Sequence, residues 1–145
     1  MRFKLVLRVN KEKYGDCIPI NYQYEASAAI YKILSRADNE YAVWLHDNGF
    51  QLDNGKKFKL FTFSRLIIKN KQIIKNSGRI KILSDTIEWQ ISFLPEKSTQ
   101  KFIEGLFLNQ IFEIGDSKSA VQFHITCVEA MPEPNYSEEM EFNTP

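Results

Sequence analysis

The segment RFKLVLRVN, residues 2–10, sets the start of the fold. Hydrophobic side chains occupy alternate positions of this segment, and the positions between them are mostly basic, with Val6 as the exception. The alternating hydrophobic residues are Phe3, Leu5, Leu7 and Val9. A period of two predicts a β-strand that has one face in the core and the other in solvent. Residues 11–20, which follow, are predicted to form a loop.

Two helices are predicted after this loop. Hydrophobic residues recur at helical spacing through about Arg36, and Asn21 is expected to cap this first helix. Its hydrophobic positions are Ala26, Ala29, Ile30, Ile33, Leu34 and Ala37. Asp38 or Asn39 is expected to cap a second, shorter helix, which ends near Asn48.

The second half of the chain contains further strand patterns and one helix. Strands are predicted in residues 57–69 and in residues 71–83, where Asn76–Gly78 supplies a turn. Residues 87–93 alternate like another strand, and residues 102–107 have helical spacing. The last strand is expected to place its hydrophobic residues on one face. These residues are Val121, Phe123, Ile125 and Cys127.

The order of these elements, β-α(α)-β-β-α-β, predicts an α+β fold of the ferredoxin-like, or RRM-like, split βαβ type. Such a fold has an antiparallel sheet with helices on one face. The opposite face is open, and RNA-recognition modules of this topology bind single strands there. With 145 residues, 43% of them hydrophobic, the chain can bury one core, so we expect one domain over residues 1–130. Residues 131–145 have no periodicity and are expected to form a tail or the start of an interdomain linker.

Positive charge is concentrated in one stretch, although the net charge of the whole chain is only +1. Nine cations and no acidic residue lie between Asn54 and Ser84, whereas the chain after Lys118 is acidic. Apart from Lys59, these cations are expected to contact nucleic-acid phosphates. They are Lys56, Lys57, Arg65, Lys69, Lys71, Lys75, Arg79 and Lys81. The alternative is a hairpin whose lysines are solvated and protect an edge strand from aggregation.

The composition argues against membrane, secreted and metal-binding proteins. No hydrophobic run approaches the roughly 18 residues of a membrane-spanning helix, and we expect no secretory signal. Cys17 and Cys127, the two cysteines of the chain, are expected to be reduced and separately buried, which fits a cytoplasmic protein. His46 and His124 are far apart in the sequence and there is no CxxC motif, so no metal site is predicted.

Four segments, in matching order and spacing, resemble the N-terminal half of a known enzyme family. The segments are MRFKLVLRV (residues 1–9), IPINYQYEASAAIYKIL (18–34), YAVWLHDNGF (41–50) and KKFKLFTFSRL (56–66). They are similar to the CRISPR-associated repeat endoribonucleases of the repeat-associated mysterious protein (RAMP) superfamily. The resemblance continues more loosely to Val128. It implies an enzyme that cuts precursor CRISPR RNA, with the CRISPR repeat RNA as its partner.

The resemblance also implies a catalytic triad of Tyr31, His46 and Lys59, and cleavage without a metal or another cofactor. In this reaction the 2′-hydroxyl attacks the adjacent phosphate and leaves a 2′,3′-cyclic phosphate and a 5′-hydroxyl. An unperturbed imidazole titrates at about pH 6.5, so His46 is expected to transfer the proton. Lys59 is expected to stabilise the transition state. Tyr31 is expected to orient the RNA, or to act as a base if a nearby cation lowers its pKa.

Each triad residue also has a purely structural interpretation. Tyr31 then packs against the core, His46 lies at the boundary of a short helix, and Lys59 is a solvated strand lysine. His124 is expected to face away from the core and to take no part in catalysis, which leaves a role in RNA binding open.

Members of this family usually have a second ferredoxin-like domain with a glycine-rich loop, which the 145 residues do not contain. We therefore expect the chain to be the N-terminal part of a two-domain protein, and the alternative is a relative that has one domain. Two alternatives stay open, a non-catalytic RNA-binding RAMP subunit of a CRISPR effector complex and a ferredoxin-like protein-interaction module. Other effector subunits, or a second copy of the chain in a homodimer, are the protein partners left open.

Overall fold

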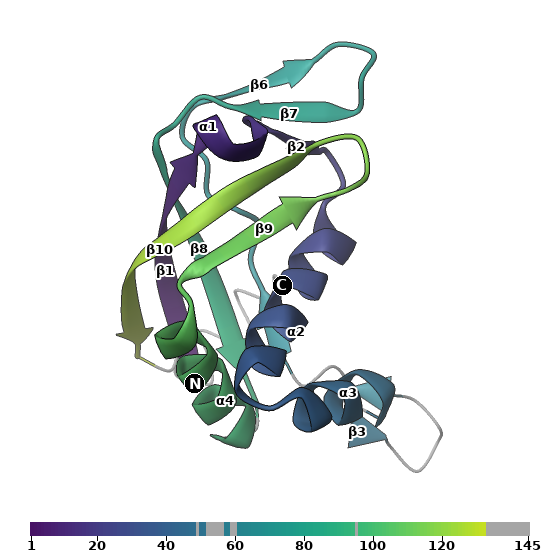
Figure 1. The fold of residues 1–145 in the computed structure, drawn as a ribbon, viewed down its shortest axis with the longest axis vertical. Coiled ribbons are helices and arrows are strands. Elements are labelled where there is room, and N and C mark those ends of the chain that lie inside the picture. Colours follow the sequence, from purple (N-terminus) through teal and green to yellow (C-terminus); the bar gives the residue numbers. More distant parts are fainter. Residues whose placement is uncertain (49, 52–56, 59–60, 95, 133–145) are drawn as a thin grey trace.

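The computed structural model describes residues 1–48, 50–51, 57–58, 61–94 and 96–132. Within this part, an antiparallel sheet of five strands forms the centre of the molecule, in the order β5-β8-β1-β10-β9 (Figure 1). Hydrogen bonds between strands that are distant in the sequence therefore hold the sheet together. The five strands are β1 (Arg2–Asn10), β5 (Phe61–Phe63), β8 (Thr86–Phe93), β9 (Ile111–Gly115) and β10 (Ala120–Met131).

Three helices lie against one face of this sheet or beside it, as Figure 1 shows. They are α2 (Gln23–Ala37), α3 (Asn39–Asn48) and α4 (Glu96–Leu108). Helix α4 sits on the sheet through Phe102, whose ring centroid is 4.9 Å from that of Phe93 and 6.4 Å from that of Phe3. Helices α2 and α4 approach each other closely at Gly105, where a Cβ atom would lie 2.1 Å from the carbonyl oxygen of Ile33. A side chain at position 105 would therefore push the two helices apart.

The predicted alternation of residues 2–10 is confirmed by burial. In β1 and β8 every second side chain is buried beneath the helices, and the side chains between them lie on the opposite face. The opposite face carries ion pairs, including those of Lys4 with Glu88 (3.6 Å) and with Glu129 (3.3 Å). The buried residues of these two strands are Phe3, Leu5, Leu7, Val9, Ile87, Trp89, Ile91 and Phe93.

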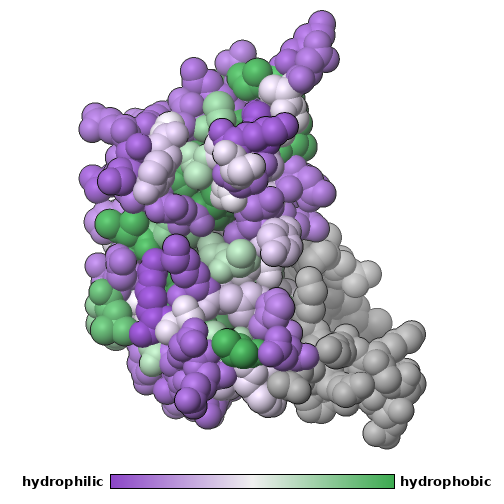
Figure 2. Space-filling model, turned by 45° about the vertical axis from the view of Figure 1, so that its right-hand side comes forward, coloured by the Kyte–Doolittle hydropathy of each residue, from purple (hydrophilic) through white to green (hydrophobic). Residues whose placement is uncertain are grey.

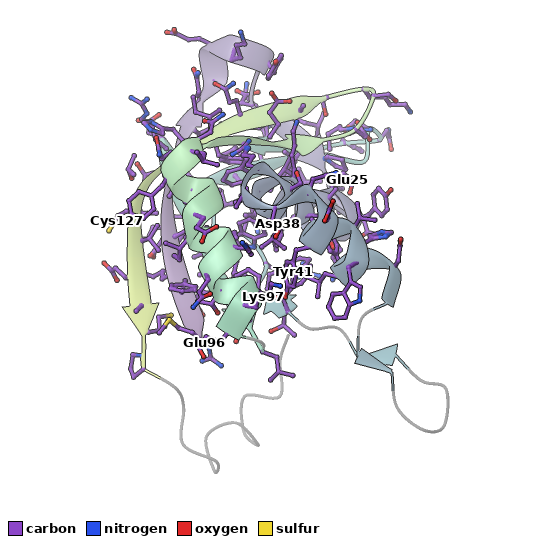
Figure 3. All side chains as sticks on the ribbon, turned by 60° about the horizontal axis from the view of Figure 1, so that its bottom comes forward. Glu25, Asp38, Tyr41, Glu96, Lys97 and Cys127 are labelled. Carbon is purple, nitrogen blue, oxygen red and sulfur yellow. The ribbon has the colours of Figure 1, made fainter. Side chains whose placement is uncertain are left out.

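Strand β10 contains a bulge that changes which of its residues face the core. Leu7 pairs with Ile125 but the preceding Val6 pairs with Cys127, so Thr126 is an extra residue in the ladder. The Thr126 hydroxyl donates a hydrogen bond to the carbonyl oxygen of Val6 at 3.2 Å. Cys127 is consequently exposed (Figure 3), and the expectation that it shares the hydrophobic face with Val121, Phe123 and Ile125 is wrong.

A second, three-stranded sheet in the order β2-β7-β6 lies at one end of the molecule. The hairpin of β6 (Lys71–Ile74) and β7 (Arg79–Ile82) confirms the predicted turn, because Asn76 and Gly78 have φ angles of 62° and 68°. Both are in the left-handed region that tight hairpin turns require. The third strand, β2 (Cys17–Pro19), pairs with β7.

Several short elements differ from the prediction. Residues 11–20 were predicted to form a loop, but they contain α1 (Lys11–Tyr14) and β2. Strand β9 was not predicted at all. The predicted strand over 57–69 is interrupted: β4 (Lys57–Phe58) pairs with β3 (Phe50–Gln51), and β5 belongs to the main sheet. These elements are only two to five residues long, which is too short for a hydrophobic period to reveal them.

One helix cap was predicted correctly and one was not. The Asp38 carboxylate accepts the backbone N–H of Tyr41 at 3.0 Å and so caps α3. Helix α2 begins at Gln23, and Tyr22 occupies its N-cap position without a side-chain capping bond. The expectation that Asn21 caps α2 is therefore wrong.

In the described part of the chain, no helix is long and apolar enough to cross a membrane. The two cysteines are separate thiols, as predicted, but the expectation that both are buried is wrong, because Cys17 is half-buried and Cys127 is exposed. Nor does any group of three or more His, Cys, Asp or Glu residues among the described ones have the arrangement of a metal site. The tail predicted over 131–145 lies outside the described residues, except for Met131, which ends β10, and Pro132.

Candidate functional site

Tyr31 of α2 and His46 of α3 lie in contact. Their ring centroids are 5.1 Å apart and the ring planes meet at 76°, an edge-to-face arrangement. The contact arises because α3 follows α2 after a single residue, Asp38, and packs back against it. Two of the three residues predicted to act together are thus neighbours in space.

Helix α3 is fixed in place by contacts to α4 as well as by its cap. The carboxylate of Asp38 lies 3.4 Å from the ammonium group of Lys101, and the Tyr41 hydroxyl forms a buried hydrogen bond with the Ser98 hydroxyl. The ammonium group of Lys97 lies over the ring of Tyr41, 5.1 Å from its centroid. Figure 3 shows Asp38, Tyr41 and Lys97 gathered between the two helices. These contacts hold the helix that carries His46 on the body of the domain.

Tyr31 is half-buried, and its second aromatic neighbour is Phe61 of β5. The ring centroids of Tyr31 and Phe61 are 5.2 Å apart, again edge to face. Burial raises the pKa of the Tyr31 phenol above its ordinary value, and the described residues supply no cation that offsets this effect. The phenol is therefore protonated at neutral pH and suits the donation of a hydrogen bond better than the role of a base.

His46 is exposed, with 68% of its side chain accessible to solvent. Its Nδ1 atom lies 3.2 Å from the Oδ1 atom of Asp47. When the Nδ1–H group donates a hydrogen bond to this carboxylate, Nε2 of the neutral ring is unprotonated and can accept a proton. Asp47 is thus placed to set the tautomer of the imidazole.

An open cavity of about 300 Å³ contains both predicted residues. Its lining residues are Tyr31, Lys32, Ser35, Asn39, Ala42, Val43, His46 and Asp47. The side of the molecule formed by α2 and α3 comes forward in Figure 2, where polar side chains cover most of the visible surface. Lys32 and Asp47 were not predicted as site residues, although each is the sequence neighbour of a predicted one. Lys32 adds an exposed cation to the cavity.

The third predicted catalytic residue, Lys59, lies outside the described residues, as does Lys56. Lys57 is in β4, but its side chain is also outside the described part. The roles assigned to these three lysines stay predictions.

The remaining cations of the basic stretch are of two kinds. Arg65, Lys69, Lys71 and Lys75 are exposed. Arg79 instead holds Asp116 through a guanidinium–carboxylate contact of 2.8 Å, which lowers the pKa of that carboxyl group below its ordinary value. The ammonium group of Lys81 lies 4.0 Å from the carboxylate of Asp16. Contact of these residues with RNA stays a prediction, and Arg79 has a structural partner that competes for its charge.

His124 lies on the polar face of the sheet, where its Nδ1 atom is 3.1 Å from the guanidinium group of Arg8. The rings of Tyr31 and His46 lie on the helix side, so His124 belongs to a different surface.

The sequence profile of the family described as CRISPR-associated protein Cas6, N-terminal, matches residues 17–126. The chain belongs to the Cas6 family. It is 32% identical over 134 residues to the CRISPR-associated endoribonuclease Cas6 1 of Methanocaldococcus jannaschii, and the match covers 92% of this chain and 46% of that protein. The resemblance of the four segments to CRISPR-associated endoribonucleases is thus confirmed.

Solved structures of Cas6 and RAMP proteins have a similar fold. A Cas6-related protein of Pyrococcus furiosus superposes with a TM-score of 0.71 at 28% identity, over 93% of this chain and 49% of that one. A RAMP protein that binds different RNA substrates gives a TM-score of 0.68 at 24% identity, over 93% of this chain and 50% of that one, which shows the shared fold alone. The chain spans about half the length of the relatives it matches.

Proposed function

We propose that the protein is a metal-independent endoribonuclease that cuts precursor CRISPR RNA within its repeats. The contact between Tyr31 and His46 is the observation that carries the proposal, because it joins a proton-transfer group and a hydrogen-bond donor in one solvent-open cavity. Membership of the Cas6 family, whose relative in M. jannaschii is an endoribonuclease, supports the assignment.

The proposed reaction is an internal transfer within the RNA. The 2′-hydroxyl loses its proton while the 2′-oxygen–phosphorus bond forms, the bond from phosphorus to the 5′-oxygen breaks, and the 5′-oxygen takes up a proton. The atoms and charges balance without water, so the products are a 2′,3′-cyclic phosphate and a 5′-hydroxyl. We assign the proton transfer to His46, and the donation of a hydrogen bond to the phosphate to Tyr31, whose raised pKa keeps it protonated.

Lys59 is proposed to stabilise the negative charge on the phosphorane. It stands two positions before Phe61, whose ring contacts Tyr31. An ammonium group placed there would act mainly in the transition state, so its removal would slow cleavage more than it weakens binding.

We also propose that residues 1–130 form one ferredoxin-like unit. The order β5-β8-β1-β10, with α2 between β1 and β5 and α4 between β8 and β10, supports this topology, and β9 adds a strand at one edge. CRISPR repeat RNA is the partner that the proposal requires. A second candidate function is a non-catalytic RNA-binding RAMP subunit of a CRISPR effector complex.

Single-turnover cleavage of the repeat RNA in excess EDTA tests the proposal, with the protein as its gene encodes it. We expect cutting at one position within the repeat, and mass spectrometry of the upstream product should show a cyclic phosphate. An RNA with a 2′-deoxynucleotide at the cleavage position is the control and should stay intact. Strict dependence on Mg²⁺ or Mn²⁺, or cleavage of the deoxy control, would contradict the mechanism. Binding without cleavage would favour the second candidate.

A further inference from the structure

A second cavity, of about 430 Å³, lies where the start of α2 meets the end of β5. Ligand pockets commonly have volumes of about 300–1,000 Å³, so the space is large enough for one nucleotide. Its lining residues are Ile20, Asn21, Tyr22, Gln23, Phe63, Ser64 and Arg65. No member of the predicted catalytic triad lines it.

Three polar side chains at this cavity have no partner within the described part of the chain. The amides of Asn21 and Gln23 and the guanidinium group of Arg65 make no hydrogen bond or ion pair with another described residue, and all three residues are exposed. Asn21 has this freedom because it does not cap α2. Groups of this kind that converge on one space are typical of a site that binds a polar ligand.

The other polar side chains of the cavity, Ser64 and Tyr22, form hydrogen bonds within the domain. The Ser64 hydroxyl donates to the carbonyl oxygen of Arg65 at 2.8 Å and accepts the N–H of Gln90 at 3.0 Å. The Tyr22 oxygen accepts the N–H of Leu66 at 2.8 Å, and burial raises the pKa of this phenol, so it keeps its proton for donation. These contacts fix the walls and leave the amides, the guanidinium group and one phenolic proton for a ligand.

Phe63 and Ile20 are apolar residues that line the cavity, and Phe63 supplies an aromatic ring. This ring is half-buried, stacks on Phe61 with 6.3 Å between centroids, and meets Trp89 edge to face at 5.7 Å. A supported aromatic ring beside an arginine and two amides is the combination with which proteins hold unpaired nucleotides. The ring stacks on the base, the amides bond its edge, and the arginine binds phosphate.

The cavity is also close to the candidate cleavage site. Two successive ring contacts, of 5.2 Å from Tyr31 to Phe61 and 6.3 Å from Phe61 to Phe63, link the two places along β5. Phe61 and Arg65 are four residues apart in the sequence, so they are separated by at most about 14 Å. An RNA strand bound at Tyr31 and His46 needs only a few nucleotides to reach Arg65.

We propose that this cavity binds one unpaired nucleotide of the repeat RNA close to the scissile phosphate. Its base stacks on Phe63, Asn21 and Gln23 bond the edge of the base, and Arg65 binds the phosphate. The cavity thereby contributes to the choice of cleavage position. This proposal rests on the proposed function, because the ligand is the RNA that the Tyr31–His46 site would cut.

An abasic scan of the RNA, performed on the protein as its gene encodes it, tests the proposal. Repeat RNAs that each lack one base near the cleavage position are compared for affinity and for single-turnover rate. In the wild type we expect one position at which loss of the base weakens binding about 10-fold or more, as for other stacked bases. In Asn21→Ala/Gln23→Ala, and separately in Phe63→Leu, the same position should lose most of its effect while the other positions keep theirs.

The variants are chosen so that every outcome bears on the proposal. Asn21 and Gln23 are exposed, so their alanine variants should fold even if Phe63→Leu does not. Phe107→Leu is the control for the loss of an aromatic ring outside the cavity, because Phe107 lies on α4 and does not line the cavity. An unchanged abasic profile in folded Asn21→Ala/Gln23→Ala would overturn the inference and leave the nuclease intact. A wild type that neither binds nor cuts the repeat would instead overturn the proposed function.

Discussion

Arg79 on β7 holds the carboxylate of Asp116, in the turn between β9 and β10, through two nitrogen–oxygen contacts of 2.8 Å each. The pair joins the small sheet to the main sheet, because β7 and β9 belong to different sheets. Ser119, in the same turn, adds a third contact of 3.1 Å to the guanidinium group. One of the cations in the basic stretch therefore has a clear structural role.

The first prediction concerns this ion pair and pH. The pKa of the Asp116 carboxyl is lowered by the hydrogen bond from Arg79, so the pair stabilises the fold at any pH above the ordinary carboxyl pKa of about 3.9. That contribution is lost as the pH falls through the lowered value. Asp116→Asn should therefore reduce the melting temperature at pH 7, and the difference from the wild type should shrink as the solution is acidified towards pH 2.

Asp85→Asn is the matched control for this experiment, because the Asp85 side chain is 94% exposed and its ionic partner among the described residues is Lys11. It should change the melting temperature very little at either pH. A constant difference between Asp116→Asn and the wild type across the whole pH range would contradict the assigned cause.

The second prediction concerns the two residues that the structure brings together. His46→Ala should slow single-turnover cleavage about 10²-fold or more, the usual effect of losing a general acid or base. Tyr31→Phe keeps both ring contacts and removes only the hydroxyl, so it should fold normally and also cut more slowly. The readout is the cleavage rate at saturating protein, measured beside the affinity. Wild-type rates for His46→Ala would show that another group transfers the proton.

The third prediction concerns the exposed lysines of the small sheet and the loop before it. Reversing Lys69, Lys71 and Lys75 to glutamate should weaken RNA binding and make it less dependent on salt. Each phosphate neutralised on a single strand contributes about −0.7 to the log–log salt slope, so the loss of three contacts should flatten the slope by about 2. Filter binding at several salt concentrations measures both quantities.

Stability should change little in this variant, because surface substitutions usually alter the free energy of unfolding by about 0.5 kcal/mol or less. Lys118→Glu is the control for a single reversal, Lys71→Glu, since both residues are exposed lysines and Lys118 lies in the turn between β9 and β10. If the affinity and the salt slope are unchanged in the triple variant, these lysines are solvated residues that do not contact the RNA, and the RNA binds elsewhere.

The fourth prediction concerns the contact between α2 and α4. Helix propensity alone predicts that Gly105→Ala stabilises the protein, by about 1 kcal/mol. The structure predicts the opposite sign, because the new Cβ atom would lie 2.1 Å from the carbonyl oxygen of Ile33 and force the helices apart. Overpacking of this kind typically costs about 1–3 kcal/mol. Denaturant unfolding of Gly105→Ala, beside exposed Glu104→Ala, measures the sign directly.

The sequence predicted secondary structure correctly where a hydrophobic pattern repeats over many residues. β1, β8, α2 and α4 each contain at least eight residues, and their periodicity predicted all four. β2, β9 and the interrupted β4–β5 region were missed or merged because they are only two to five residues long, and β2 and β5 also depend on partners far along the chain. The Thr126 bulge was unpredictable for a related reason: the extra residue is visible only against the partner strand β1.

The candidate site was also predicted only in part. Tyr31 and His46 came from the family resemblance, and the structure adds their contact and the raised pKa of Tyr31. The cavity at Phe63 and Arg65 could not be predicted, because its walls come from two segments, residues 20–23 and 63–65, that are distant in the sequence. Asn21 illustrates the difficulty well, since its position before a helix suggested a cap.

The bulge at Thr126 also determines the chemical reactivity of the surface. By turning Cys127 outward, it gives the polar face of the sheet an accessible thiol, whereas burial and the neighbouring Asp16 raise the pKa of the half-buried Cys17. The thiolate is the form that attacks an alkylating reagent and displaces its leaving group, so accessible Cys127 should be modified first. A fluorophore could therefore be attached beside Val6 in the unmutated protein. It would report whether RNA also passes over the sheet, on the side opposite the Tyr31–His46 cavity.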